Sequence, residues 1–128
     1  MAVIVSADDD PDIREYVRRV LIRDGHQVLA VPDGVSALAL IREQRPDMVV
    51  LDVDMPGMNG LEVCRTLRAD PEFADLPVVI ASGSIAPPFT EVIAAGASDM
   101  LPKPYLPQQL RDCVGKYVVG KHESGAPA

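Results

Sequence analysis

Hydrophobic residues along this chain follow two patterns in turn. The first is a short unbroken apolar run, which is typical of a strand buried on both faces of a parallel sheet. Five such runs, which we expect to be strands, are Ala2–Ser6, Val28–Val31, Asp47–Leu51, Val78–Ala81 and Asp99–Leu101. Helical spacing fills the segments between them, and this alternation predicts an α/β fold.

The segments between the runs carry hydrophobic residues every three or four positions, as amphipathic helices do. The clearest is Pro11–Asp24, which begins with proline and ends before Gly25. A second helix is expected between the N-cap Asp33 and Pro46. The residues that mark the buried faces of the five helices are Ile13, Val17, Val20 and Leu21; Val35, Leu38 and Ile41; Leu61, Cys64 and Leu67; Phe89, Val92 and Ile93; and Leu106, Leu110, Cys113, Val114 and Tyr117.

Proline and glycine limit the last two helices. Pro87-Pro88 is expected to delay the fourth helix and keep it short, because proline fits only a first turn. Gly115 weakens the last turns of the fifth helix. The helical pattern is lost from Gly120, so we expect one domain over residues 1–120 and a flexible C-terminal tail, or the start of a linker, over residues 121–128.

Five strands joined by right-handed helical crossovers predict a doubly wound, five-stranded parallel sheet with helices on both faces. We expect the flavodoxin-like strand order 2-1-3-4-5. The 128 residues, 48% of them hydrophobic, suffice for one such core and not for two. Where the winding reverses, the carboxyl ends of neighbouring strands open a crevice that holds the chemistry of such folds.

The formal net charge of −7 narrows the range of partners. A surface of this sign repels phosphate backbones, so no direct nucleic-acid binding is expected. No apolar run approaches the ~20 residues of a membrane helix, and the first residues lack a signal-like segment, so we expect no membrane association and a cytoplasmic location. Cys64 and Cys113 are expected to be buried, reduced thiols on opposite faces of the sheet.

Acidic residues follow two of the strand ends at this crevice. Asp8-Asp9-Asp10 follow the first strand and Asp52-Val53-Asp54 close the third, and these strands are neighbours in the expected order. Carboxylates this close either raise a pKa or bind a cation, and oxygen ligands favour Mg²⁺. Taken alone, the same residues could equally cap a helix and form a turn.

Ser82, at the end of the fourth strand, and Lys103, after the fifth, add a hydroxyl and an ammonium group to the same edge. A carboxylate nucleophile, a metal site, a hydrogen-bond donor and a counter-charge are what a phosphorylated carboxylate needs. Together these residues favour phosphoryl transfer to an aspartate.

With these residues in place, the sequence resembles the receiver domains of two-component response regulators, chemotaxis regulators among them, from Ala2 to about Val119. The motifs that carry the resemblance are Ala7–Arg14, Val49–Gly60, Leu76–Ser82, Gly96–Asp99 and Lys103–Tyr105. The resemblance implies that Asp52 is the phosphoacceptor. It also implies that Asp8 and Asp9 are the acidic pair for Mg²⁺ (or Mn²⁺), with Asp9 the direct ligand, and that Asp54 offers its backbone carbonyl to the metal.

The same resemblance implies a switch. Ser82 is expected to act as the switch hydroxyl, and Lys103 is expected to pair with the phosphoryl group and to precede a cis peptide bond. Receivers commonly carry an aromatic residue in the fifth strand that moves with the hydroxyl. This chain has Met100 there, a flexible thioether without a phenol.

A receiver of this kind implies a histidine kinase or a phosphotransfer protein as the phosphoryl donor, with phosphorylation of Asp52 switching a protein-interaction surface. The expected catalysis is limited to the domain's own phosphoryl transfer to Asp52 and hydrolysis from it, so it is not an enzyme in the usual sense. The downstream partner is expected to be an unknown protein or an output domain missing from these residues. The domain is expected to be a monomer or a weak, phosphorylation-dependent dimer.

Three alternatives remain at this point. A haloacid-dehalogenase-like phosphatase would use Asp52 as nucleophile and Asp54 as general acid. A flavodoxin-like cofactor binder would need a Ser/Thr/Gly phosphate loop where this chain has Asp8-Asp9-Asp10, which would repel a phosphate. A receiver that has become a constitutive interaction module would not be phosphorylated, although Asp9, Asp52 and Lys103 are all present.

Overall fold

The computed structural model describes residues 2–83 and 88–124, with the backbone alone over 119–124. Its five strands are β1 (Val3–Ala7), β2 (Gln27–Val31), β3 (Met48–Asp52), β4 (Val78–Ser82) and β5 (Asp99–Pro102). The helices are α1 (Pro11–Arg23), α2 (Gly34–Gln44), α3 (Gly60–Arg68), α4 (Phe89–Ala94) and α5 (Pro107–Ser124), with a short 3₁₀ helix at Pro71–Phe73. Among the described residues, no helix is long and apolar enough to cross a bilayer.

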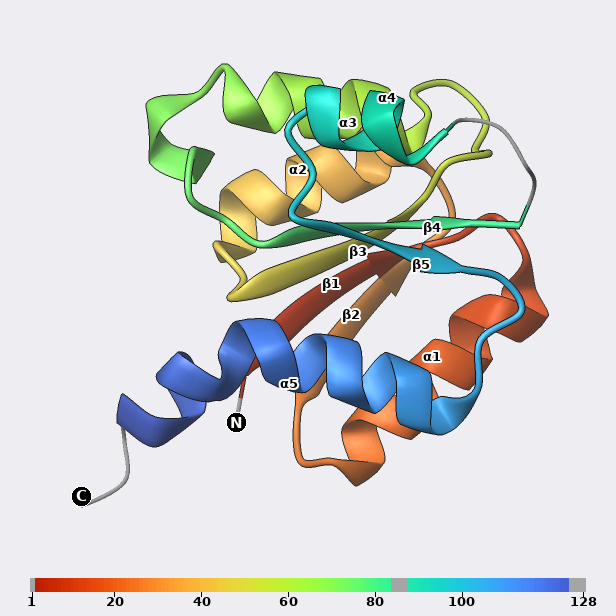
Figure 1. Cartoon of the computed structure of the whole chain (residues 1–128), viewed down its shortest axis with the longest axis vertical. Coiled ribbons are helices and arrows are strands. Elements are labelled where there is room, and N and C mark those ends of the chain that lie inside the picture. Colours follow the sequence, from red (N-terminus) through yellow and green to blue (C-terminus); the bar gives the residue numbers. More distant parts are fainter. Residues whose placement is uncertain (1, 84–87, 125–128) are drawn as a thin grey trace.

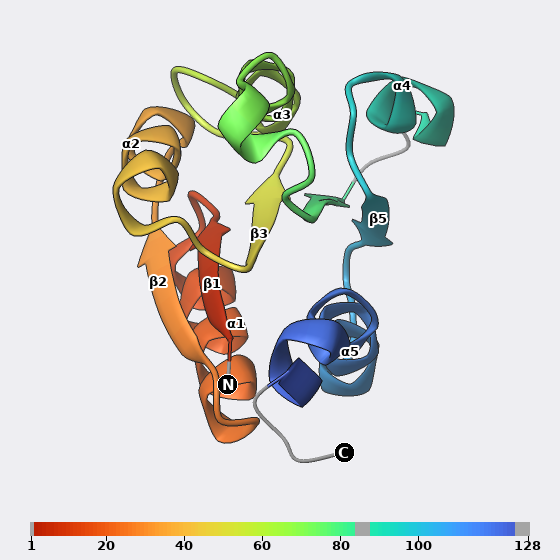
Figure 2. The same ribbon diagram turned by 90° about the vertical axis from the view of Figure 1, so that its left-hand side faces the viewer.

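The strands form one parallel sheet in the order β2-β1-β3-β4-β5. Helices α1 and α5 cover one face, and α2, α3 and α4 cover the other (Figures 1 and 2). The predicted fold class, strand order and two-sided helical cover are therefore confirmed. The order places β1 beside β3, so the acidic segments that follow these strands meet at one edge.

The core consists of two layers, one on each face of the sheet. Cys64 is buried in the layer under α3, whereas Cys113 packs at the border of the layer under α5 and is only partly buried. Both are free thiols. Their positions on opposite faces agree with the prediction, and the partial exposure of Cys113 corrects the expectation that it is fully buried.

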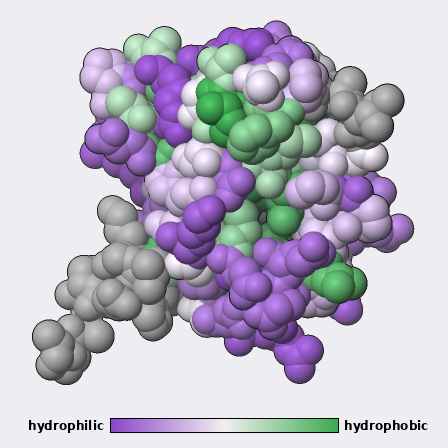
Figure 3. All heavy atoms as spheres, in the orientation of Figure 1, coloured by the Kyte–Doolittle hydropathy of each residue, from purple (hydrophilic) through white to green (hydrophobic). Residues whose placement is uncertain are grey.

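Several residues predicted to face the core lie at the surface instead. The exposed fractions are 58% for Val35, 56% for Phe89, 40% for Ile93 and 67% for Leu106. The space-filling view shows hydrophobic surface over α4 and β5 (Figure 3). In α2 the buried residues include Ala37, Leu38 and Ile41, so the buried face of this helix contains Ala37 rather than Val35.

The element ends differ from the predictions by one or a few residues. Strands β1, β3, β4 and β5 each end one residue later than expected, because pairing of the backbone, rather than side-chain hydropathy, sets the end of a strand. Helix α5 continues to Ser124, past the loss of pattern at Gly120. The domain limit at residue 120 stays a prediction, and residues 125–128 of the expected tail lie outside the described residues. Helix α4 has six residues and begins after Pro88, so it is short, as predicted from Pro87-Pro88. Pro87 itself lies outside the described residues.

Candidate functional site

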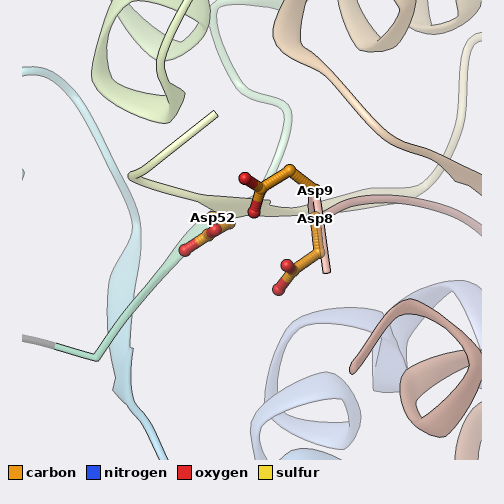
Figure 4. Close-up of side chains that lie close together, drawn as sticks. All are labelled: Asp8, Asp9 and Asp52. Atoms are coloured by element: carbon orange, nitrogen blue, oxygen red, sulfur yellow. The ribbon is translucent and has the colours of Figure 1, made fainter. Parts of the chain in front are cut away.

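Three aspartates meet at the carboxyl edge of the sheet. Asp8 and Asp9 directly follow β1, and Asp52 is the last residue of β3, which pairs with β1 in register at Ala7 and Leu51. One carboxylate oxygen from each of the three residues lies within 4.8 Å of the other two (Figure 4). Asp8 and Asp52 are buried, whereas Asp9 is exposed. The predicted approach of the two acidic segments is thus present in the structure.

Lys103 connects two of these carboxylates. Its Nζ lies 2.8 Å from Oδ2 of Asp8 and 3.1 Å from Oδ1 of Asp52. Burial disfavours the ammonium form, but the hydrogen bonds to Asp8 and Asp52 outweigh it and raise the pKa of Lys103. The lysine therefore carries its positive charge into the acidic cluster at neutral pH.

The pKa of Asp52 is raised by its surroundings, whereas a carboxylate in an ordinary ion pair has a lowered pKa. Burial raises the pKa of Asp52, and the charges of Asp8 and Asp9 add to this effect, while Lys103 opposes it. The cluster has three carboxylates, and the one ammonium group that contacts it, Lys103, pairs with Asp8 and Asp52, so negative charge is in excess among the described residues of the cluster. Such a cluster favours binding of a cation.

A set of backbone hydrogen bonds fixes the position of Asp8. Its N–H donates to the carbonyl of Val31 at 3.1 Å, and its Oδ1 accepts from the N–H of Asp10 at 2.9 Å. Nη1 of Arg14 donates to the carbonyl of Asp8 at 2.9 Å. The Asp10 side chain accepts from the N–H of Asp12 at 2.8 Å and caps α1. Asp10 is thus the N-cap of α1. The contact of Arg14 with the carbonyl of Asp8 was not predicted from the sequence pattern.

The remaining predicted residues lie around this cluster. Ser82 is buried at the end of β4, and its carbonyl accepts the N–H of Lys103 at 2.8 Å. Met100 is partly buried against the core layer under α3 and pairs with Ile80. The side chain of Asp54 is exposed and is not part of the carboxylate cluster, so its expected contribution remains the backbone carbonyl. The peptide bond between Lys103 and Pro104 is cis, as the resemblance implies.

The turn after β3 leaves no room for a side chain at Gly60. The N–H of Gly60 donates to the carbonyl of Val53 at 3.1 Å, and the Asn59–Glu62 capping box begins α3 at this residue. A Cβ on Gly60 would collide with the carbonyl oxygen of Asp52. The absence of a side chain here allows α3 to begin directly against the backbone of Asp52.

We expect Gly60→Ala to lower the free energy of unfolding by about 1–3 kcal/mol, because the added methyl group must displace rigid backbone. Gly115→Ala is the matched control: Gly115 lies inside α5, and a Cβ there would meet nothing within 4 Å. This second change is expected to raise the free energy of unfolding by about 0.5–1 kcal/mol through helix propensity. Urea unfolding of both variants measures the two effects, and a stable Gly60→Ala variant would contradict the close approach.

The donor set of the cluster fits a hard divalent cation. Asp8, Asp9 and Asp52 offer only carboxylate oxygens, and the exposed position of Asp9 leaves the cluster open on one side. Mg²⁺ and Mn²⁺ prefer such oxygen ligands and keep several waters. The residues present therefore fit the predicted metal.

Comparisons with known proteins point to one family. The sequence matches the family described as response regulator receiver domain over residues 4–115. The response regulator MprA of Mycobacterium sp. (strain KMS) is 46% identical over 110 residues, which cover 84% of this chain and 46% of MprA. The DNA-binding response regulator MtrA of Mycolicibacterium smegmatis is 39% identical over 108 residues, again with 84% and 46% coverage. The chain spans about half the length of these curated relatives.

Solved structures agree with this match. The chemotaxis response regulator CheY4 of Vibrio cholerae superimposes with a TM-score of 0.86 at 30% sequence identity. The superposition covers 91% of this chain and 98% of that one.

Proposed function

The chain belongs to the response regulator receiver domain family, and on this basis we propose that Asp52 accepts a phosphoryl group from a phosphohistidine of a histidine kinase or a phosphotransfer protein. The domain is a signalling domain of two-component response regulators rather than a classical enzyme. The observation that carries the proposal is the cluster of Asp8, Asp9 and Asp52 with Lys103 at the switch point of the sheet.

The contacts of the two buried carboxylates favour Asp52, rather than Asp8, as the nucleophile. Asp8 is engaged at both oxygens, since Oδ1 accepts from the N–H of Asp10 and Oδ2 accepts from Lys103. For Asp52, the contact given by the described residues is at one oxygen: Oδ1 lies 3.1 Å from Nζ of Lys103. Asp52 therefore keeps a carboxylate oxygen for attack.

In the proposed reaction, a carboxylate oxygen of Asp52 attacks phosphorus in line, the bond between phosphorus and the imidazole nitrogen breaks, and an acyl phosphate forms on Asp52. Lys103, already within 3.1 Å of Asp52, neutralises charge on the phosphoryl oxygens. A divalent cation held by Asp8, Asp9, Asp52 and the carbonyl of Asp54 would supply further neutralisation of that charge. Later attack of water on phosphorus releases inorganic phosphate and restores the carboxylate.

The proposed output begins at Ser82. Its hydroxyl would hydrogen-bond to the phosphoryl group, and this would draw the end of β4 toward Asp52. Because β4 pairs with β5 and the carbonyl of Ser82 accepts the N–H of Lys103, a shift of β4 reaches both β5 and the residue that follows it. Met100, in β5 and packed against the core, is in a position to change its packing in response. A bias of a few kcal/mol between two existing arrangements is enough for such a switch.

The receiver is proposed to act on a downstream protein or on a linked output domain. Relatives about twice as long include one described as a DNA-binding response regulator, so an output domain attached to residues 1–120 through 121–128 is one form of this proposal. The exposed Phe89 and Ile93 of α4 give the domain hydrophobic surface for a protein contact. Association as a weak, phosphorylation-dependent dimer is part of the same proposal.

The phosphatase alternative gains no support. The family match and the relatives are response regulators. In addition, the general acid of that mechanism would be Asp54, and its side chain is exposed and outside the carboxylate cluster.

The test is incubation of the purified protein with acetyl phosphate and Mg²⁺, followed by intact-mass spectrometry. We expect a mass gain of one phosphoryl group that hydroxylamine removes, because hydroxylamine cleaves acyl phosphates but not phosphoserine. A protein that gains no mass, or a gain that survives hydroxylamine, would contradict phosphorylation of an aspartate. Steady hydrolysis of a generic phosphoester would instead favour a phosphatase.

A further inference from the structure

Tyr16 forms a long-range contact with the segment that carries Lys103. Its hydroxyl donates to the backbone carbonyl of Tyr105 at 3.0 Å, across 89 residues of sequence. The two tyrosine rings also contact each other, with centroids 6.0 Å apart. Tyr16 lies in α1, so this contact ties α1 to the link between β5 and α5.

The link that carries Lys103 has few backbone hydrogen bonds of its own. Within the link, residues 103–106, Pro104 has no N–H to donate, and neither have Pro102 and Pro107, which flank it. Lys103 donates its N–H to the carbonyl of Ser82 on the β4 side, at 2.8 Å. On the α5 side, the N–H of Leu106 donates to the side chain of Gln109 at 2.7 Å. The hydrogen bond from Tyr16 is the contact that joins the middle of this link to α1 in the described structure.

Packing around the link is also incomplete. Lys103, Pro104 and Tyr105 line an open hollow of about 510 Å³, whose other side is formed by Ile13, Tyr16 and Gly83. The side chain of Tyr105 is buried in the core layer under α5, so the weakly packed part of the link is Lys103 and Pro104. These two residues depend more on individual hydrogen bonds around them. Burial raises the pKa of Tyr16, so the hydroxyl keeps the proton that it donates.

From these contacts we infer that Tyr16 is a positioning residue for phosphoryl transfer: by holding the carbonyl of Tyr105, it keeps the ammonium group of Lys103 at Asp8 and Asp52. This inference rests on the proposed function. Tyr16 touches none of the reacting groups, and its effect on the reaction passes through Lys103. Helix α1 then supports both sides of the site, because Arg14, in the same helix, holds the carbonyl of Asp8.

The test compares Tyr16→Phe with Tyr117→Phe. Each change removes one tyrosine hydroxyl and its hydrogen bond, since the hydroxyl of Tyr117 lies 3.0 Å from both the carbonyl of Ser98 and Oδ2 of Asp99, away from the site. We expect the initial rate of phosphorylation by acetyl phosphate with Mg²⁺ to fall about fivefold in Tyr16→Phe, the factor that corresponds to one hydrogen bond of ordinary strength. Tyr117→Phe should retain the wild-type rate although it loses at least as much stability, because one partner of its hydroxyl is the charged Asp99. Because acetyl phosphate is a small molecule, a change in rate cannot come from a change in the docking of a partner protein.

A double-mutant cycle separates positioning from a general structural role. In a Lys103→Ala background, Tyr16→Phe is expected to cause no further loss of rate, because the group that it positions is gone. Equal rates in Tyr16→Phe and the wild type, an equal loss in Tyr117→Phe, or a full effect of Tyr16→Phe without Lys103 would each overturn this inference alone. A wild-type protein that takes no label would overturn the proposed function and this inference with it.

Discussion

Asp52→Ala is expected to abolish phosphorylation of this domain, with a loss of at least about a hundredfold in the initial rate. Asp52 supplies the attacking oxygen, and the neighbouring carboxylates have other roles in the proposal: both oxygens of Asp8 accept hydrogen bonds, and Asp9 is the direct metal ligand. The measurement is intact-mass spectrometry after incubation with acetyl phosphate and Mg²⁺, with hydroxylamine treatment to identify an acyl phosphate.

The matched control is Asp75→Asn, which changes an exposed carboxylate outside the cluster. It should be labelled at the wild-type rate. Circular dichroism and urea unfolding should show that Asp52→Ala remains folded, because the change also removes one of several carboxylates that repel one another. Label that persists in folded Asp52→Ala would place the acceptor on another residue.

The sequence was sufficient to locate the candidate site because of two properties of parallel sheets. Buried strands of such sheets are unbroken apolar runs, so the end of each strand is visible in the sequence within a residue or two. The carboxyl ends of all the strands also meet at one edge, so Asp8, Asp52 and Lys103, far apart in the chain, could be placed together from strand order alone. The structure adds the contacts of Lys103 with both aspartates.

Contacts that depend on side-chain direction across the fold could not be predicted in this way. From the sequence, Tyr16 is one more residue of an amphipathic helix, and no nearby residue predicts that its hydroxyl donates to the carbonyl of Tyr105. Hydropathy likewise misplaced Val35 and Leu106, because an apolar side chain at helical spacing can still face solvent at the end of an element. Local patterns thus indicate which elements form, while the packing of those elements decides which side chains meet.

Removal of divalent cations is expected to lower the initial rate of phosphorylation at least about a hundredfold, because charge that develops on the phosphoryl oxygens would then face three carboxylates. EDTA should cause this loss, and added Mg²⁺ or Mn²⁺ should reverse it. A second measurement needs no phosphoryl donor: a cation that binds the folded cluster should raise the midpoint of thermal unfolding as its concentration increases.

Two neighbouring substitutions distinguish a metal ligand from a helix cap. Asp9→Ala should raise the Mg²⁺ concentration for half-maximal phosphorylation at least about tenfold, with little loss of stability, because its side chain is exposed. Asp10→Ala should lower the free energy of unfolding by about 1 kcal/mol through loss of the α1 cap, with the metal requirement unchanged. The same Mg²⁺ requirement in Asp9→Ala and in the wild type would exclude Asp9 as a ligand. It would leave Asp8 and Asp52, both within reach of Lys103, as the acidic groups of the site.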